Sequence, residues 1–298
     1  MSSLARKKRN FIILSLIIPT LLLICFVVLP AFDLFRMSFT NWDGMSPSSD
    51  FIWLDNYKSM LGNADLWQSL KNNAVYFAVH LCMIPVELAF AVLLTSKLRA
   101  AKFYKTMVFM PYIINGVAIS YAFSYFFSPV NGAFDAILKA LHMGMLSGHG
   151  WLSDPGIVNF VLAFVSLWRF SGYHVVLFMA ALQSLPQDVQ EAARVDGAGP
   201  WQCFCRITLP GLKGTAFLTA VLSVINSFKV FREAYLVAGD YPHESIYMLQ
   251  HLFNNWFVSL DIQKMSAASV MVEAAVLIPV LACLGAFRRK HPKRSSTD

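Results

Sequence analysis

The sequence predicts an all-α, polytopic membrane protein with six transmembrane helices. Its 298 residues are 57% hydrophobic and only 14% charged, whereas soluble domains are roughly 25% charged. Apolar segments of about 20 residues recur along the chain, and that length crosses about 30 Å of hydrocarbon as a helix. In lipid these segments must be helical, because an open strand would leave backbone groups without hydrogen-bond partners.

Six apolar segments are long enough to cross the membrane. They are residues 11–32, 72–96, 106–128, 157–182, 212–231 and 266–287. The first resembles a signal peptide, but its apolar run exceeds the roughly 7–15 residues of a signal, and no clear small-x-small cleavage site follows it. We therefore expect an uncleaved anchor.

The distribution of Lys and Arg predicts that both termini are cytoplasmic. Clusters at residues 6–9, 97–105, 194–213 and 288–294 hold 16 of the 24 basic residues. All four clusters fall on one side of a six-span chain, and basic loops stay in the cytoplasm. Residues 1–10 and 288–298 are then cytoplasmic tails. The net charge of +7 reflects topology, so nucleic-acid binding is not expected.

Signatures of catalysis are missing from the sequence. It contains no phosphate-binding Gly-x-x-x-x-Gly-Lys-[Ser/Thr] loop, no His-Glu-x-x-His and no Gly-x-Ser-x-Gly. Cys203 and Cys205 lack a second pair or a histidine at metal-binding spacing, so they are interpreted as small apolar fillers. We expect no catalytic residue, metal or cofactor on this chain.

A polar stretch at residues 184–210 separates the fourth and fifth expected spans. Ser184 and Gln187 have capping-box spacing, which predicts the start of a short helix, and Gly197 predicts its end. A second short helix should end at Pro210. Its expected apolar face consists of Trp201, Phe204, Ile207 and Leu209. By itself this pattern fits either a surface that docks into a partner or an ordinary connector.

The stretch also resembles the EAA loop of permeases from binding-protein-dependent ATP-binding-cassette importers. Glu191-Ala192-Ala193, then Gly197, then Ile207-Thr208-Leu209-Pro210 match every specified position. The resemblance implies that this loop couples the permease to an ATPase. The residues that it assigns to coupling are Glu191, Ala192, Ala193, Asp196, Gly197, Ile207, Leu209 and Pro210.

Most of the chain is similar to the sugar-uptake branch of these permeases, which includes the maltose, lactose and glycerol-3-phosphate systems. The matching stretches are residues 38–42, 54–57, Pro111, 151–155, 181–186 and 196–198. One stretch departs from this branch. Residues 237–242 replace the Gly-Gly-Pro turn that relatives tend to have after the fifth span, which bears on the outer gate and the substrate class.

The resemblance implies a division of labour within an assembly. This chain, with a permease core at residues 72–287, would pair with a second homologous permease and translocate a carbohydrate by alternating access. An ATPase dimer would hold ATP and Mg on the cytoplasmic side, and a solute-binding protein would deliver substrate from outside. The assembly would lie in the bacterial cytoplasmic (inner) membrane, in contact with lipid.

Polar residues inside the spans are further candidates, because charge in a bilayer is costly and usually serves a function. The candidates for the pathway or for charge pairs are Glu87, Arg169, Asn226, Lys229 and Glu273. Depth along the helices predicts that Arg169 pairs with Glu87, and that Lys229 pairs with Glu273. The alternative is local, with Lys229 reaching the membrane interface along its own stem.

Two rival functions remain open from the sequence. A secondary, ion-coupled transporter of a small polar solute would also use buried charges, but such folds tend to show internal repeats, and no convincing repeat is present. A membrane-embedded enzyme would need clustered acids or histidines, which are dispersed here. Both rivals leave the loop at 184–210 unexplained.

Overall fold

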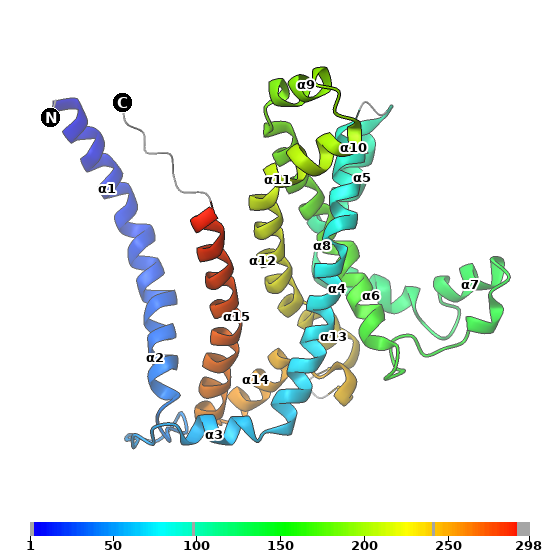
Figure 1. Cartoon of the computed structure of the whole chain (residues 1–298). Coiled ribbons are helices and arrows are strands. Elements are labelled where there is room, and N and C mark those ends of the chain that lie inside the picture. Colours follow the sequence, from blue (N-terminus) through cyan, green and yellow to red (C-terminus); the bar gives the residue numbers. More distant parts are fainter. Residues whose placement is uncertain (1–2, 97–98, 240–241, 291–298) are drawn as a thin grey trace. The chain divides into compact units, whose positions relative to one another are not determined.

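The computed structural model describes residues 3–96, 99–239 and 242–290, and helices dominate it (Figure 1). Within these ranges β pairing is limited to an isolated antiparallel bridge between Thr40 and Phe51. The all-α class is therefore confirmed. The chain divides into two units, one of residues 1–66 with 253–298 and one of residues 67–252.

The first unit contains the first and last spans. Helix α1 (Ser3–Leu23) continues through a short π-helical turn (Ile24–Val28) into α2 (Leu29–Met37). Helix α15 (Ile262–Lys290) packs against α2 and against the short helix α3 (Asp55–Leu61). Side chains of the first span are exposed in this chain, as expected for a helix that faces lipid or another subunit.

Side-chain hydrogen bonds hold the loop between α2 and α3. Asn56 Nδ2 donates to the backbone carbonyls of Ser38 at 2.9 Å and Thr40 at 2.8 Å. The Ser38 hydroxyl lies 2.6 Å from the Tyr57 hydroxyl. Residues 38–42 and 54–57, which resemble the sugar-uptake permeases, therefore have a structural role in fastening this loop.

The second unit holds the remaining spans and the polar stretch between them. Helices α4 (Ala64–Thr95) and α14 (Leu249–Val258) cross its two boundaries in the chain. The elements between them are α5 (Ala101–Ile113), α6 (Gly116–Phe126), α7 (Ala133–Ala140), a 3-10 turn (Gly144–Leu146), α8 (Val158–Ser184), α9 (Gln187–Val195), α10 (Pro200–Cys203), a π-helical turn (Phe204–Thr208), α11 (Leu209–Gly211), α12 (Lys213–Lys229), α13 (Phe231–Ala238) and a 3-10 turn (Glu244–Ile246).

Five described helical stretches are long and apolar enough to cross a membrane: Lys7–Met37, Ala64–Thr95, Val158–Ser184, Lys213–Val237 and Ile262–Ala282. The third expected span, residues 106–128, is broken. Helices α5 and α6 replace it and are bent by 99° relative to each other. The break follows Pro111, where Ile114 is extended and the Asn115 side chain caps Val117 N at 2.8 Å.

The core of the second unit forms where α4, α8 and α12 meet. Near the end that carries the stretch at 187–211, Ala91 of α4, Phe178 of α8 and Leu212 share a buried cluster. Nearer the other end, Tyr76 packs with Leu162 and other buried side chains. For helices in lipid such packing stabilises through close van der Waals contact, because lipid tails are as apolar as these side chains. Helix α8 also packs closely on α5, at a point where Gly172 faces the Val108 carbonyl.

Candidate functional site

The polar stretch predicted at 184–210 folds as a helix, a glycine turn and a second helical segment, which we call the coupling segment (residues 187–211). Helix α9 begins at Gln187, directly after Pro186. The capping box expected from Ser184 is not formed, because Ser184 is the last residue of α8 and its hydroxyl donates to the Ala181 carbonyl at 2.8 Å. Asp188 in the first turn complements the helix dipole.

Gly197 ends α9 as the sequence predicts, and its backbone explains the choice of residue. Its φ is +82°, a left-handed conformation that glycine adopts without steric cost. The following N–H, of Ala198, bonds to the Ala193 carbonyl at 2.9 Å, and Asp196 N bonds to Ala192 O at 3.0 Å. These bonds satisfy carbonyls that the end of the helix would otherwise leave without partners.

The second half of the coupling segment starts at Gly199 and stays helical to Gly211. Pro210 was expected to end it, but this residue lies in the first turn of α11, where a missing N–H is tolerated, and the helix continues to Gly211. Trp201 and Phe204 stack with ring centroids 5.7 Å apart.

The coupling segment presents apolar and charged side chains to solvent. Val195 is 87% exposed and Trp201 is 74% exposed. Glu191, Ala192, Asp196, Gly197, Leu209 and Pro210 are also exposed, and Ala193 and Ile207 are half-buried. Beneath the segment lies a hollow of about 570 Å³, whose lining includes Thr95, Leu182, Arg194 and Phe204. The segment is thus exposed on its outer side.

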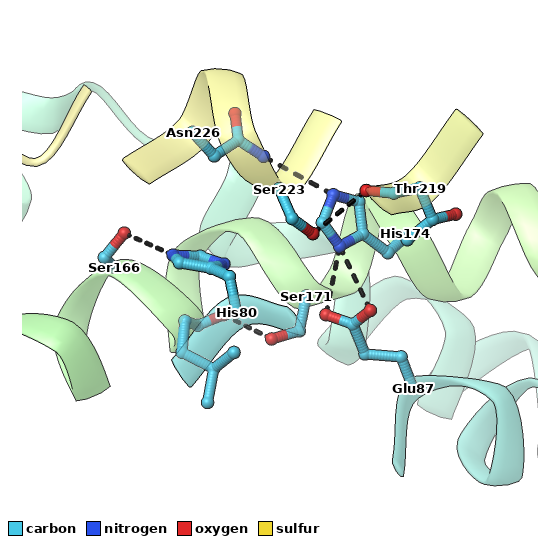
Figure 2. Close-up of polar contacts among 9 residues, drawn as sticks. His80, Glu87, Ser166, Ser171, His174, Thr219, Ser223 and Asn226 are labelled. Carbon is cyan, nitrogen blue, oxygen red and sulfur yellow. Dashed lines mark hydrogen bonds and ion pairs between the residues drawn. The ribbon is translucent and has the colours of Figure 1, made fainter. Parts of the chain in front are cut away.

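A second polar region lies buried within the spans, and Figure 2 shows its contacts. Both carboxylate oxygens of Glu87 on α4 lie close to His174 Nδ1 on α8, at 3.0 and 3.1 Å. Asn226 Nδ2 on α12 lies 3.4 Å from the other ring nitrogen of His174. The relative exposures are 1% for Glu87, 0% for His174 and 4% for Asn226. One imidazole therefore links three helices.

The chemistry of the ring sets how this link can work. A carboxylate only accepts hydrogen bonds, so an ionised Glu87 requires a proton on His174 Nδ1. In neutral His174, Nε2 then accepts from the Asn226 amide N–H. The site holds a carboxylate and its hydrogen-bond partners where water is excluded. It has no nucleophile adjacent to a base, so it suits helix positioning better than catalysis.

The predicted pairing of Glu87 with Arg169 is wrong in its partner, because His174 occupies the place beside the carboxylate. Glu87 lies eight residues before the end of α4, and His174 lies ten residues before the end of α8. At about 1.5 Å per residue these positions are at similar depth, whereas Arg169 lies a further turn and a half away. Depth measured from the ends of α4 and α8 therefore favours His174 over Arg169 as the partner of Glu87.

Arg169 and Lys229 both lie beside the ring of Phe170. The Arg169 guanidinium carbon is 5.1 Å from the ring centroid, and Lys229 Nζ is 5.6 Å from it. The Arg169 guanidinium also fills the space beside Gly116, at the start of α6. Glu273 belongs to the other unit, on α15, so its expected pairing with Lys229 stays a prediction.

One region that resembles the sugar-uptake permeases has a structural explanation here. Trp151 Nε1 donates to Asp135 Oδ1 at 2.8 Å, and Gly148 N donates to Asp135 Oδ2 at 2.7 Å. These bonds lower the pKa of Asp135, with the Trp151 bond contributing most. Asp135 was missed from the sequence because its partners follow it by more than ten residues.

Of the stretch 237–242, which departs from the sugar-uptake permeases, residues 240 and 241 lie outside the described residues.

The chain has similar relatives along most of its length. It is 30% identical over 269 residues to YurN of Bacillus subtilis, described as a probable ABC transporter permease, covering 89% of this chain and 91% of that one. It is 27% identical over 282 residues to the diacetylchitobiose uptake system permease protein NgcF of Streptomyces coelicolor, covering 90% and 80%.

A solved structure shares the fold. The crystal structure of a bacterial alginate ABC transporter in complex with an alginate pentasaccharide-bound periplasmic protein matches with a TM-score of 0.78 and 20% identity, over 96% of each chain. Residues 87–294 match the family described as the inner membrane component of binding-protein-dependent transport systems. These residues include α8, the coupling segment and α12. The chain therefore belongs to this family of inner-membrane transport components.

Proposed function

We propose that this chain is the transmembrane permease subunit of an ATP-binding-cassette importer for a carbohydrate. The observation that carries the proposal is the exposed helix, glycine turn and helix at residues 187–211, in a chain of the binding-protein-dependent family. Transport in that family depends on a separate binding protein. The chain's membership of the family therefore does not support the alternative of an ion-coupled transporter.

The proposed topology has six crossings, with the bent pair α5 and α6 counted as one. Both termini and the coupling segment would then be cytoplasmic, because the basic clusters at residues 6–9, 97–105 and 288–294 fall on that side. The bacterial cytoplasmic membrane would hold the subunit. Residues 72–287 would form the permease core, preceded by the anchor at 11–32.

The proposed coupling uses the exposed face of α9. Glu191 would contact a basic group on the ATPase, while the small side chains of Ala192 and Ala193 would allow close approach. The apolar side chains of Val195 and Trp201, 87% and 74% exposed, would become buried in the contact. ATP and Mg would bind to the ATPase dimer, so this chain needs differential contacts between two states and no catalytic residue of its own.

The proposed substrate class follows from the relatives and from the spans. NgcF is described as part of a diacetylchitobiose uptake system, and the solved relative is a transporter of alginate. We place Arg169, Asn226 and Lys229 beside the translocation pathway, with a second homologous permease completing it. Glu273 would serve there or in a charge pair. The solute-binding protein would deliver the carbohydrate from outside.

Two measurements test this function. A strain that lacks this chain should lose accumulation of at least one solute from a labelled panel of maltose, lactose, diacetylchitobiose and glycerol 3-phosphate, and restoring the chain should recover it. An affinity-tagged chain purified in mild detergent should bring an ATPase with it. Undiminished uptake of the whole panel, together with no associated ATPase, would exclude the proposal.

A further inference from the structure

The buried link of Glu87, His174 and Asn226 lies on the two helices that flank the coupling segment. Helix α8 runs into the segment and α12 leaves it. His174 is ten residues before the end of α8, and Asn226 is thirteen residues after the start of α12. They are therefore about 15 Å and 20 Å along their helices from the segment. A movement of the segment would reach both residues through continuous helix.

Helices α4 and α8 are joined by short polar contacts at three levels. Tyr76 donates to Asn159 Oδ1 at 2.7 Å, His80 Nε2 lies 2.8 Å from Ser166 Oγ, and Glu87 lies 3.0 Å from His174. The second and third of these contacts are drawn in Figure 2. Their spacing along both helices makes a continuous seam. Such buried contacts are costly to break, because neither partner finds water.

The contacts that bring α12 to this seam are longer. Asn226 Nδ2 lies 3.4 Å from His174 Nε2, and Asn73 Nδ2 lies 3.5 Å from the Ser227 carbonyl. Both are near the outer limit for a hydrogen bond, where the interaction is weak. When the coupling segment moves, α12 should therefore separate from α8 before α8 separates from α4.

We propose that Asn226 is a positioning residue that latches α12 to the α4–α8 pair through His174, and that this latch opens when the ATPase subunits close. The inference rests on the proposed function. A contact made in one state only biases the equilibrium toward that state. The latch thus holds the assembly at rest, and its loss favours the state that hydrolyses ATP.

The test uses the assembly of this chain with its partner permease and ATPase subunits, purified into lipid nanodiscs. MgATP is the only added solute, and hydrolysis is measured with and without the purified solute-binding protein. Asn226→Ala removes the latch. Ser166→Ala is the matched control, because it breaks an equally buried contact between α4 and α8 that does not reach α12.

The expected result is a rise in basal hydrolysis of about two- to threefold for Asn226→Ala, the effect of losing one weak hydrogen bond at the low end of the usual range, with a matching fall in stimulation by the binding protein. Ser166→Ala should keep the basal rate of the parent protein. An unchanged basal rate in Asn226→Ala, or an equal rise in Ser166→Ala, would overturn the latch.

A double variant separates the latch from general loosening. The combination of Asn226→Ala with His174→Gln should raise basal hydrolysis no further than His174→Gln alone, since His174→Gln already removes the contact with Asn226. Additive increases would contradict the proposal. If Asn226→Ala accumulates poorly, Asn226→Ser is judged by the same criteria. Absence of an associated ATPase from the unmodified assembly would instead refute the proposed function.

Discussion

The coupling segment and the buried polar seam belong to the same unit of the chain but are built in opposite ways. The coupling segment is exposed, contains a left-handed glycine and lies over a hollow of about 570 Å³. The seam between α4 and α8 is closed, with His80 and His174 at 0% exposure and Glu87 at 1%. One region offers side chains to a partner, and the other satisfies its own polar groups.

On the proposed function, this difference explains how a transport subunit responds to the movement of a partner. Partners bind surfaces whose apolar groups are still exposed, as Val195 and Trp201 are. Motion then travels through helices that keep their contacts. Removing the Glu87 carboxylate from the seam should therefore reduce the amount of folded protein, whereas variants of the coupling segment should leave that amount unchanged and reduce transport.

The largest effect is expected from Glu87→Ala. This change leaves the buried N–H of His174 Nδ1 without an acceptor, which costs about 1–3 kcal/mol, and it adds the cost of the cavity left by the shortened side chain. The yield of folded protein and the midpoint of thermal unfolding should both fall. Glu87→Gln keeps an oxygen acceptor and should lose much less. Equal stability of Glu87→Ala and the parent protein would contradict a structural role for the pair.

A smaller loss is expected from Gly172→Ala, which tests the close packing of α8 on α5. The added Cβ would lie 1.9 Å from the Val108 carbonyl oxygen, so the helices would have to move apart at a cost of about 1–3 kcal/mol. Gly214→Ala on α12 is the control, because nothing lies within 4 Å of its added Cβ. Thermal unfolding of the two variants should separate clearly, and similar midpoints would argue against the close approach.

Gly197→Ala tests the turn of the coupling segment. It forces an L residue to φ +82° at a cost of about 1 kcal/mol, which should displace α9 from its dock. Uptake should fall about fivefold, while the amount of membrane-inserted protein stays unchanged. Gly199→Ala is matched, since its φ is −67° and both sites have open space. Equal uptake by the two variants would contradict a role for the left-handed turn at Gly197 in transport.

The smallest effect is expected in the loop held by Asp135. Its pKa is lowered in the folded protein, mainly by the Trp151 N–H. Its contribution to stability is therefore complete above the unfolded pKa of about 4, and it is lost as the pH falls through the lower folded pKa. The protection of residues 133–151 against amide hydrogen exchange, measured relative to the intrinsic exchange rate at each pH, should fall in acid. Asp135→Asn should make the protection of these residues less dependent on pH. An unaltered response to acid in that variant would show that other groups cause it.

Sequence periodicity and composition predicted the helical class and the places of most spans. The span at 266–287 lies within α15, and the span at 157–182 lies within α8 except for its first residue. The helix, turn and helix of the coupling segment also followed from local signals, because Gly197 acts on its own backbone. The break between α5 and α6 was missed, since Pro111 in an apolar run signals either a kink or a full bend.

The amino-acid sequence alone determined that this protein lies in a membrane and is helical. It also determined the stretch that resembles a coupling loop, because hydrophobicity, charge and glycine act locally. Only the tertiary structure decided the partners inside the spans. Glu87 selected His174 over Arg169 because the contact depends on the packing and rotation of α4 against α8, and a one-residue change in register rotates a helix by about 100°. The bend of 99° between α5 and α6 likewise arises from packing against α8 and α13, which no single segment specifies.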